Sequence, residues 1–130
     1  LALSVRLESE LADLSKEEAR EYLQGVGVAM TGLDRLIVAG YGLLGLITFL
    51  TTGEKETRAW TIRQGTKAPE AAGVIHTDFE KAFIRAEIIN FADFVACGGE
   101  ARAREAGKLR IEGKDYVMRE NDVVHFRVGV

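Results

Sequence analysis

A histidine, a threonine and two carboxylates stand close together in the middle of the chain, where they could bind a metal or move protons. They are His76, Thr77, Asp78 and Glu80. A metal site needs several ligands that converge, and an acid–base pair needs groups held within hydrogen-bonding reach. One histidine with nearby carboxylates, in a loop that enters a predicted strand, supplies too few fixed positions. We therefore predict structural hydrogen bonds here and no metal site.

The other residues capable of catalysis have no evident partners. His125 lies in an apolar run typical of a strand, which favours an ordinary position in a sheet. Cys97, the single cysteine, precedes Gly98 and Gly99 at the end of a predicted helix, with no histidine or clear basic group beside it to activate the thiol. No serine has a plausible arrangement with a histidine and an aspartate. We therefore predict no catalytic residue in this chain.

Two pairs of basic and aromatic side chains could hold single-stranded RNA, the cation on a phosphate and the ring on a base. They are Arg58 with Trp60 and Lys114 with Tyr116. Alternation along a strand would put Arg58, Trp60 and Ile62 on the same face. This favours Trp60 as a core residue or a contact between domains.

Charge is unevenly distributed along the chain. The formal net charge is −3, with 4 basic and 7 acidic side chains in residues 1–45 and 13 of each in residues 46–130. Residues 101–119 hold six basic and three acidic side chains. A solvated charged face is the default interpretation, and such a patch alone would bind phosphates weakly and in a salt-sensitive way. The candidates for RNA binding in this segment are Arg102, Arg104, Lys108, Arg110 and Lys114.

The composition is that of a globular protein with one domain, or with one small domain and an appended element. The chain has 130 residues, 47% hydrophobic and 28% charged, enough to bury a core. A single cysteine excludes an internal disulfide and favours a reducing compartment such as the cytoplasm. No apolar run approaches the roughly 20 residues of a membrane span. Because the chain begins at Leu1 with no methionine or basic leader, we expect a piece of a longer protein.

Three helices are predicted in the first third of the chain. Leucines recur at helical spacing in residues 5–14, with acidic residues between them. Ser15 and Glu18 have the spacing of a capping box, so a second helix should begin there and stop at Gly25. A third helix is expected over residues 31–44. Its glycines lower its intrinsic stability, so it should pack closely against another surface.

From residue 46 the hydrophobic period changes to that of strands joined by short turns. Two alternating runs around a turn at Gly53 predict a hairpin, and Pro69 fits the start of a short helix. We expect strands at residues 46–51, 57–62, 83–89, 108–112, 115–118 and 123–128, and helical segments at residues 69–73, 90–97 and 101–106. This order predicts a mixed α+β fold in which helix packs on one face of a sheet.

Several segments resemble, in the same order, the C-terminal end of the YchF or Obg-like ATPase family. The four that carry the resemblance are TTGEKETRAWTI (51–62), GTKAPEAAGVIHTDFEKAFIRAEII (65–89), AGKLRIEGKDYVM (106–118) and NDVVHFRV (121–128). Two earlier segments are similar to the last nucleotide-side motif of the family and to the helix that leads into its final domain. They are LSVRLESELADL (3–14) and TGLDRLIVAGYGLLGL (31–46).

The resemblance implies a fold, a domain division and a parent protein. Residues 46–130 would form a TGS domain, a β-grasp or ubiquitin-like fold, and residues 1–45 the helical C-terminal end of an OBG-type P-loop nucleotide-binding domain. The parent would be a cytoplasmic ATPase that uses ATP, with GTP as the alternative, and Mg²⁺. Its partner would be the ribosome, as the large subunit or the 70S particle, through ribosomal RNA or protein. We expect a monomer with no membrane contact.

Little of the family's nucleotide site can be carried over to this chain. Ser4, Val5 and Arg6 stand where the family has its base-side loop, although Val5 replaces the usual alanine. The phosphate-binding pattern GxxxxGK[ST] is absent from the sequence. The segment should therefore bind no cofactor and be inactive alone. We expect it to act as a ribosome- or RNA-binding and regulatory module, with the basic residues of 101–119 as its contact surface.

Three other functions are compatible with such a domain. One is a protein-interaction module without RNA contact. Another is the regulatory TGS domain of a different translation-related enzyme, such as a synthetase or an alarmone synthetase, although residues 3–14 argue against it. The third is a β-grasp carrier, but such carriers activate a terminal Gly-Gly, whereas this chain ends in Gly129 and Val130.

Overall fold

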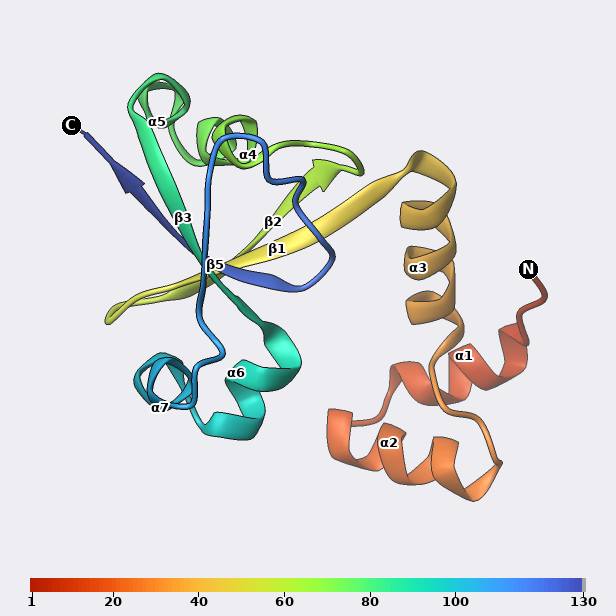
Figure 1. The fold of residues 1–130 in the computed structure, drawn as a ribbon. Coiled ribbons are helices and arrows are strands. Elements are labelled where there is room, and N and C mark those ends of the chain that lie inside the picture. Colours follow the sequence, from red (N-terminus) through yellow and green to blue (C-terminus); the bar gives the residue numbers. More distant parts are fainter. Residues whose placement is uncertain (130) are drawn as a thin grey trace. The chain divides into compact units, whose positions relative to one another are not determined.

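The computed structural model describes residues 1–129 and forms two compact units, the first Leu1–Leu44 and the second beginning at Gly45 (Figure 1). The first unit contains only helices, and the second contains a sheet with helices on both of its faces. Among the described residues, no helix is both long enough and apolar enough to cross a lipid bilayer.

The helices of the first unit are α1 (Val5–Ala12), α2 (Lys16–Gly25) and α3 (Gly32–Leu44). Side-chain caps explain where the first two begin. Ser4 Oγ accepts from the backbone N–H of Leu7 at 3.3 Å. The predicted capping box is present, because Ser15 Oγ accepts from the Glu18 N–H at 3.3 Å and Glu18 Oε2 accepts from the Ser15 N–H at 2.8 Å.

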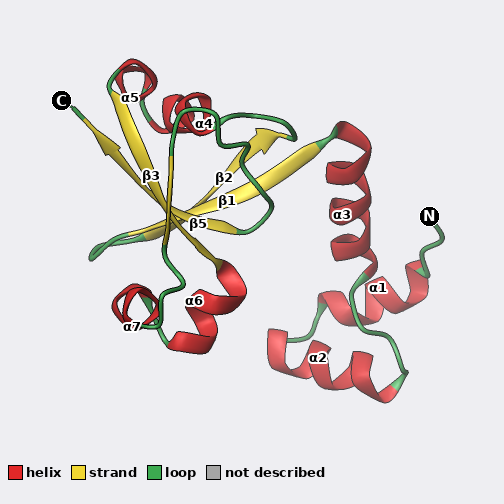
Figure 2. Cartoon of the chain, viewed as in Figure 1, coloured by secondary structure: helices red, strands yellow, loops and turns green. Residues whose placement is uncertain are grey.

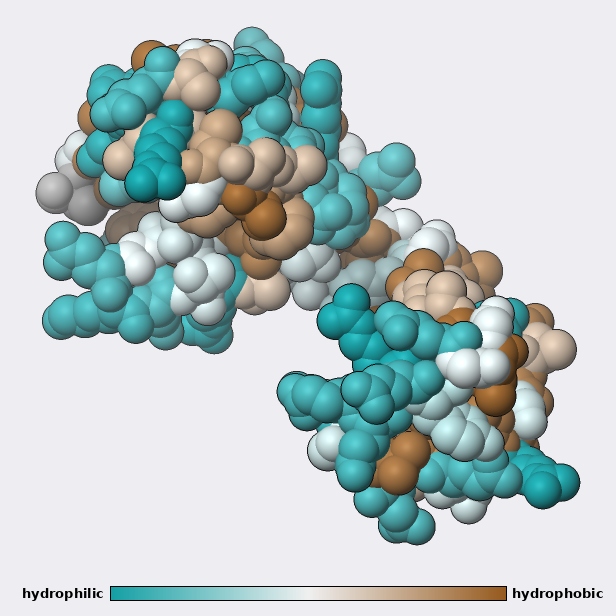
Figure 3. Space-filling view, turned by 90° about the horizontal axis from the view of Figure 1, so that it is seen from below, coloured by the Kyte–Doolittle hydropathy of each residue, from teal (hydrophilic) through white to brown (hydrophobic). Residues whose placement is uncertain are grey.

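The first unit buries few apolar side chains of its own. Among its described residues, the buried hydrophobic side chains are those of Leu11 and Leu23. Figure 3 shows apolar residues exposed among charged ones over this unit. Those of α3 that are at least 48% exposed are Leu33, Leu36, Ile37, Val38, Leu43 and Leu44. A Cβ added at Gly40 or Gly42 would meet nothing within 4 Å, so the close packing predicted for α3 is not made by the described residues.

The second unit is built on a five-stranded sheet with the order β2-β1-β5-β3-β4 (Figure 2). The strands are β1 (Leu46–Thr52), β2 (Thr57–Arg63), β3 (Phe83–Asn90), β4 (Arg110–Glu112) and β5 (Asp122–Val128). β1 pairs in parallel with β5, and the other neighbours are antiparallel. A parallel pair of first and last strands at the centre, crossed on one face by a helix, is the arrangement of a β-grasp. The predicted α+β class is confirmed.

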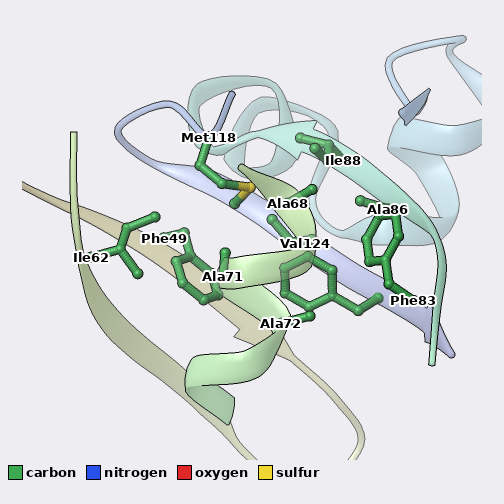
Figure 4. Close-up of a cluster of buried hydrophobic side chains, with 11 residues drawn as sticks. Phe49, Ile62, Ala68, Ala71, Ala72, Phe83, Ala86, Ile88, Met118 and Val124 are labelled. Carbon is green, nitrogen blue, oxygen red and sulfur yellow. The ribbon is translucent and has the colours of Figure 1, made fainter. Parts of the chain in front are cut away.

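One face of the sheet carries α4 (Ala68–Ile75) and α5 (Thr77–Lys81). Three alanines of α4 are fully buried, and their small side chains let the helix lie close to the sheet: Ala68, Ala71 and Ala72. Figure 4 shows them among the side chains of the main core. The strands and one loop contribute Phe49, Ile62, Phe83, Ala86, Ile88, Met118, Val124 and Phe126 to this core.

The opposite face carries α6 (Phe91–Cys97) and α7 (Glu100–Glu105), as Figure 1 shows. Asn90 ends β3 and caps α6, because its Oδ1 accepts from the Ala92 N–H at 2.9 Å. Gly98 and Gly99 have φ angles of 77° and 130°. These left-handed conformations end α6 and turn the chain into α7, as glycine permits.

Residues 115–118 form no strand, so that prediction was wrong. Tyr116 and Met118 point inward as the alternation implied, but within the described chain the segment makes one isolated bridge, from Val117 to Lys67. Its backbone bonds to the loop before α4 instead, with the Met118 N–H donating to Thr66 O at 2.9 Å. The strand expected at residues 108–112 is also shorter, because β4 begins at Arg110.

The polar link around residues 76–80 was also predicted wrongly, since residues 77–81 form helix α5. His76 is its N-cap, with Nδ1 accepting from the Asp78 N–H at 3.3 Å. Asp78 and Glu80 lie in the first turn and Lys81 in the last, which matches the helix dipole. The structural hydrogen bonding predicted for this segment is present.

Candidate functional site

Glu87, on β3, is a buried carboxylate to which three arginines donate. Arg127 makes a fork, with Nε 3.2 Å from Oε1 and Nη2 3.1 Å from Oε2. Arg85 donates to Oε1 from Nε at 3.4 Å and from Nη2 at 3.3 Å. Arg104 Nη2 donates to Oε2 at 3.3 Å. The carboxylate is therefore saturated with charge-assisted hydrogen bonds.

Strand register explains how this cluster forms. Side chains two residues apart on a strand share a face, so Arg85 and Glu87 lie together on the face of the sheet opposite the core. β3 pairs with β5 so that Arg85 lies opposite Arg127 and Glu87 opposite His125. Arg104 reaches the same point from α7.

The arginines hold the pKa of the Glu87 carboxyl below its ordinary value of 4.5. Hydrogen bonds from Arg127 are the largest cause, and burial of the carboxylate acts in the opposite direction. The same bonds raise the pKa of the Arg127 guanidinium. Glu87 is therefore negatively charged at neutral pH.

In the part of the chain that the structure describes, the ligand atoms of Glu87, Glu100 and His125 come close enough to hold a metal, all within 4.8 Å of one another. However, Arg104 Nη2 already lies between the two carboxylates, 3.3 Å from Glu87 Oε2 and 3.2 Å from Glu100 Oε1. A guanidinium thus supplies the positive charge that a metal would bring, and the neighbouring arginines would repel an added cation. The geometry favours an ion-pair cluster over a metal centre.

A second cluster surrounds Asp122, which is 1% exposed. Asp122 Oδ2 accepts from the Tyr116 hydroxyl at 2.8 Å and from the Arg119 N–H at 2.9 Å. Arg110 Nη2 donates to the Tyr116 oxygen at 3.2 Å. Burial is the largest of the effects that raise the pKa of the Tyr116 hydroxyl. Arg110 and Arg119 lie over the Tyr116 ring, with guanidinium carbons 5.5 and 6.0 Å from its centroid. These groups hold Tyr116 in place inside the fold, and its pairing with Lys114 on an RNA strand stays a prediction.

The five basic residues predicted to bind RNA fall into two groups. Arg104, Lys108 and Arg110 form ion pairs with acidic side chains, Lys108 with a carboxylate of α6 at 3.6 Å. Arg102 and Lys114 are exposed, and neither forms an ion pair with any described residue. Fewer cations of this segment are therefore available to a ligand than its composition indicates.

Trp60 packs against the core, as alternation predicted. Its ring stacks on Phe49 with centroids 6.5 Å apart, and its Nε1 donates to Thr51 Oγ1 at 2.9 Å. The Arg58 guanidinium carbon lies 4.3 Å from the centroid of the indole ring. The indole ring is thus partly covered by side chains of the same unit.

The residues expected to contact a nucleotide base lie at the start of α1. Ser4 caps the helix, Val5 is 81% exposed, and Arg6 Nε donates to Glu10 Oε1 at 3.1 Å. Val5 is therefore open to another surface, while Ser4 and Arg6 have local partners. Their contact with a base stays a prediction.

Sequence reasoning missed Arg85, Glu87 and Arg127. The spacing of two between Arg85 and Glu87, and between His125 and Arg127, was visible in runs expected to be strands. That signal indicates a polar face on each strand. It says nothing about which strands are neighbours.

Comparisons with known proteins agree with this fold. The family model YchF-GTPase_C, described as "Protein of unknown function (DUF933)", matches residues 46–129. The chain is 52% identical over 130 residues to "Ribosome-binding ATPase YchF" of Bacillus subtilis, covering 100% of this chain and 36% of that relative. It is 56% identical over 124 residues to the protein of the same name from Haemophilus influenzae, covering 95% and 34%. It is 46% identical over 127 residues to "Obg-like ATPase 1" of Gallus gallus, covering 98% and 32%.

Solved structures give the same result. The chain matches "Structure of the Schizosaccharomyces pombe YchF GTPase" with a TM-score of 0.83 and 46% identity, over 96% of this chain and 33% of that one. A GTP-binding protein from Pyrococcus horikoshii, with a TM-score of 0.54 and 24% identity over 85% and 28%, supports the fold alone. The chain spans about a third of the length of the curated relatives it matches. The family model and the relatives that match nearly the whole chain agree with one another. The chain therefore belongs to the YchF family and corresponds to the C-terminal portion of its members.

Proposed function

We propose that this chain is the C-terminal part of a ribosome-associated ATPase and that its second unit is a ribosome- or RNA-binding and regulatory module. The observation that carries the proposal is 52% identity, over all 130 residues, to a relative named as a ribosome-binding ATPase. The whole protein would be cytoplasmic. It would bind ATP, or alternatively GTP, together with Mg²⁺, and would transfer the terminal phosphoryl group to water. Because this chain has no GxxxxGK[ST] pattern, those steps would belong to residues outside it.

The first unit would complete the nucleotide-binding domain. The exposed apolar face of α3 supports this, since a helix with Val38 62% and Leu43 89% exposed needs another surface to cover it. The relatives named above are about three times as long as this chain, so they contain residues that could supply that surface. Ser4, Val5 and Arg6 would then lie beside the base.

The second unit would contact ribosomal RNA or protein, on the large subunit or the 70S particle, through the segment 101–119. Arg102 and Lys114 are the strongest candidates there, because they are exposed and have no acidic partner among the described residues. Arg104, Lys108 and Arg110 would contribute only where a phosphate can share them with their present carboxylates. Such contacts release counterions, so binding should weaken as salt is raised.

The experiment compares variants in co-sedimentation with purified ribosomes at low salt. R102E/K114E reverses the charge of Arg102 and Lys114, two exposed cations that form no ion pair with any described residue. The control K55E/K81E makes the same change of charge at two exposed lysines of the same unit. We expect R102E/K114E to lose most of the binding and the control to keep most of it.

Equal, small losses in both variants would contradict RNA contact through this segment. Binding that is also insensitive to salt would favour the alternative, a protein-interaction module without RNA contact. The mixed ion pairs of Lys108 and Arg110 are compatible with that alternative, since a surface of both signs also suits a protein partner.

A further inference from the structure

The Glu87 cluster is more basic than a buried carboxylate requires. One arginine fork is enough to pair with Glu87, yet Arg85, Arg104 and Arg127 all donate to it. Together with Glu100 the group contains three guanidiniums and two carboxylates and keeps a net positive charge. Arg85 and Arg127 also lie directly opposite each other on β3 and β5, where like charges are destabilising. Pairing of Glu87 alone does not explain this surplus.

Exposure differs strongly between the carboxylate and the guanidiniums around it. The Glu87 side chain is 5% exposed, whereas those of Arg85, Arg104 and Arg127 are 46%, 51% and 42% exposed. Each guanidinium has five N–H donors and uses at most two of its nitrogens on carboxylates here. Donors therefore remain on three half-exposed side chains that are anchored at one point.

We propose that Arg85, Arg104 and Arg127 form a binding surface for the phosphate groups of an RNA backbone and that Glu87 holds them in position. A planar guanidinium matches the oxygen geometry of phosphate and forms charge-assisted hydrogen bonds with it. Because Glu87 restricts the rotamers of the arginines before a ligand arrives, less side-chain entropy is lost on binding. Glu87 is a positioning residue in this account.

The neighbouring positions favour phosphate contact over base recognition. The paired positions on this face of β3 and β5 are Arg85 with Arg127, Glu87 with His125 and Ile89 with Val123. They include no phenylalanine, tyrosine or tryptophan, so His125 is the one ring among them on which a base could stack. The exposed His125 imidazole lies beside the two carboxylates of the cluster and adds an N–H donor. We therefore expect binding with little sequence preference and a marked dependence on salt.

The inference rests on the proposed function for the identity of the ligand, RNA, but it locates a contact outside the segment 101–119. Arg104 belongs to both surfaces. Arg85 and Arg127 lie on strands and belong only to this one. Variants of these two strand residues therefore separate the two surfaces.

The test is binding of the 130-residue chain to a short fluorescein-labelled oligouridine, followed by fluorescence anisotropy across a series of KCl concentrations. For R85Q/R127Q we expect binding at least about tenfold weaker at low salt, because two charge-assisted contacts are lost. The plot of log K against log[salt] should become shallower by about 1.4, since each phosphate contact on a single strand contributes about 0.7. The control K55Q/R63Q removes the same charge from exposed side chains that pair with no described carboxylate. Equal losses in the two variants would overturn the proposal.

E87Q separates positioning from simple attraction. The variant adds one positive charge to the surface, so attraction alone would tighten binding, as in the control E54Q at an exposed loop position. If Glu87 positions the arginines, E87Q should instead weaken binding by about threefold to tenfold. Circular dichroism tests whether E87Q is folded, and R85Q/R127Q tests the arginine surface independently of E87Q. Tighter binding by folded E87Q would overturn the positioning role.

The failure of this inference can be told from the failure of the proposed function. If the chain sediments with ribosomes and R85Q/R127Q does so equally well while binding oligouridine like the control, only the arginine surface is rejected. If the chain binds oligouridine through the arginines but never sediments with ribosomes, the arginine surface stands and the ribosomal function is rejected.

Discussion

The Glu87 carboxyl makes the stability of this fold dependent on pH. Its pKa lies below the ordinary value of 4.5 because Arg127 and Arg85 donate to its charged form. A carboxyl whose pKa is lower in the folded state stabilises the fold at pH values above its unfolded-state pKa. That stabilisation is lost as the pH falls through the folded-state pKa. Arginines stay charged throughout, so protonation of Glu87 leaves them to repel one another.

We expect E87Q to lower the free energy of unfolding at neutral pH by about 1.5 to 3 kcal/mol, the range for hydrogen bonds to a charged group. The difference from the wild-type chain should shrink as the pH falls below about 4.5, because the unfolded chain then takes up a proton that folded Glu87 does not, and it should vanish as the pH passes the lower folded-state pKa. Urea unfolding at a series of pH values measures this. A difference that stays constant from neutral to acidic pH would contradict a charged, arginine-bound Glu87.

Which cations are available for a ligand could not be predicted from the local sequence. Residues 101–119 carry a net positive charge, but Arg110 pairs with Asp122 at the start of β5, and Arg104 pairs with Glu87 on β3, a strand that is distant in the chain. Ion pairs between distant segments form only because the fold brings those segments together. By contrast, the Ser15 capping box was predictable, since both of its partners lie within one turn.

At the scale of elements, the approach of α4 to the sheet depends on its alanines. Ala71 is fully buried where the helix meets the core that contains Phe49. We expect A71L to lower the free energy of unfolding by about 1 to 3 kcal/mol, because added methylenes in a packed core displace the helix. The control V74L enlarges an exposed residue of the same helix and should change stability by less than about 0.5 kcal/mol. Thermal unfolding of the two variants checks this, and equal stability would show that α4 does not pack as described.

The predicted elements succeeded where periodicity was long or where a proline, an N-cap or glycines marked the ends of a helix, and failed at two short segments without such signals. β1 and β2 alternate over a full hairpin, and the structure pairs them from Leu46 with Arg63 to Thr52 with Thr57. Residues 115–118 alternate too, but inward-facing side chains do not make a strand without a partner backbone. Helix α5 spans five residues with a histidine cap, which is too short for a hydrophobic period.

At the scale of the whole molecule, the two units should differ in their ability to fold alone. A separate chain of residues 45–130 should unfold cooperatively because it contains the main core. Residues 1–44 should show little helix alone, since Leu11 and Leu23 are their buried hydrophobic side chains among those described, and short helices are marginal in water. Circular dichroism with urea tests both pieces. A cooperative transition for residues 1–44 would contradict the proposal that this unit completes a larger domain.

In the function proposed above, the second unit binds the ribosome by electrostatic contact. The most direct measurement is co-sedimentation of the 130-residue chain with purified ribosomes, without nucleotide, across a series of salt concentrations. We expect binding at low salt that falls steeply as salt rises, with log K linear in log[salt]. A chain that circular dichroism shows to be folded, and that fails to sediment with ribosomes even at low salt, would contradict it.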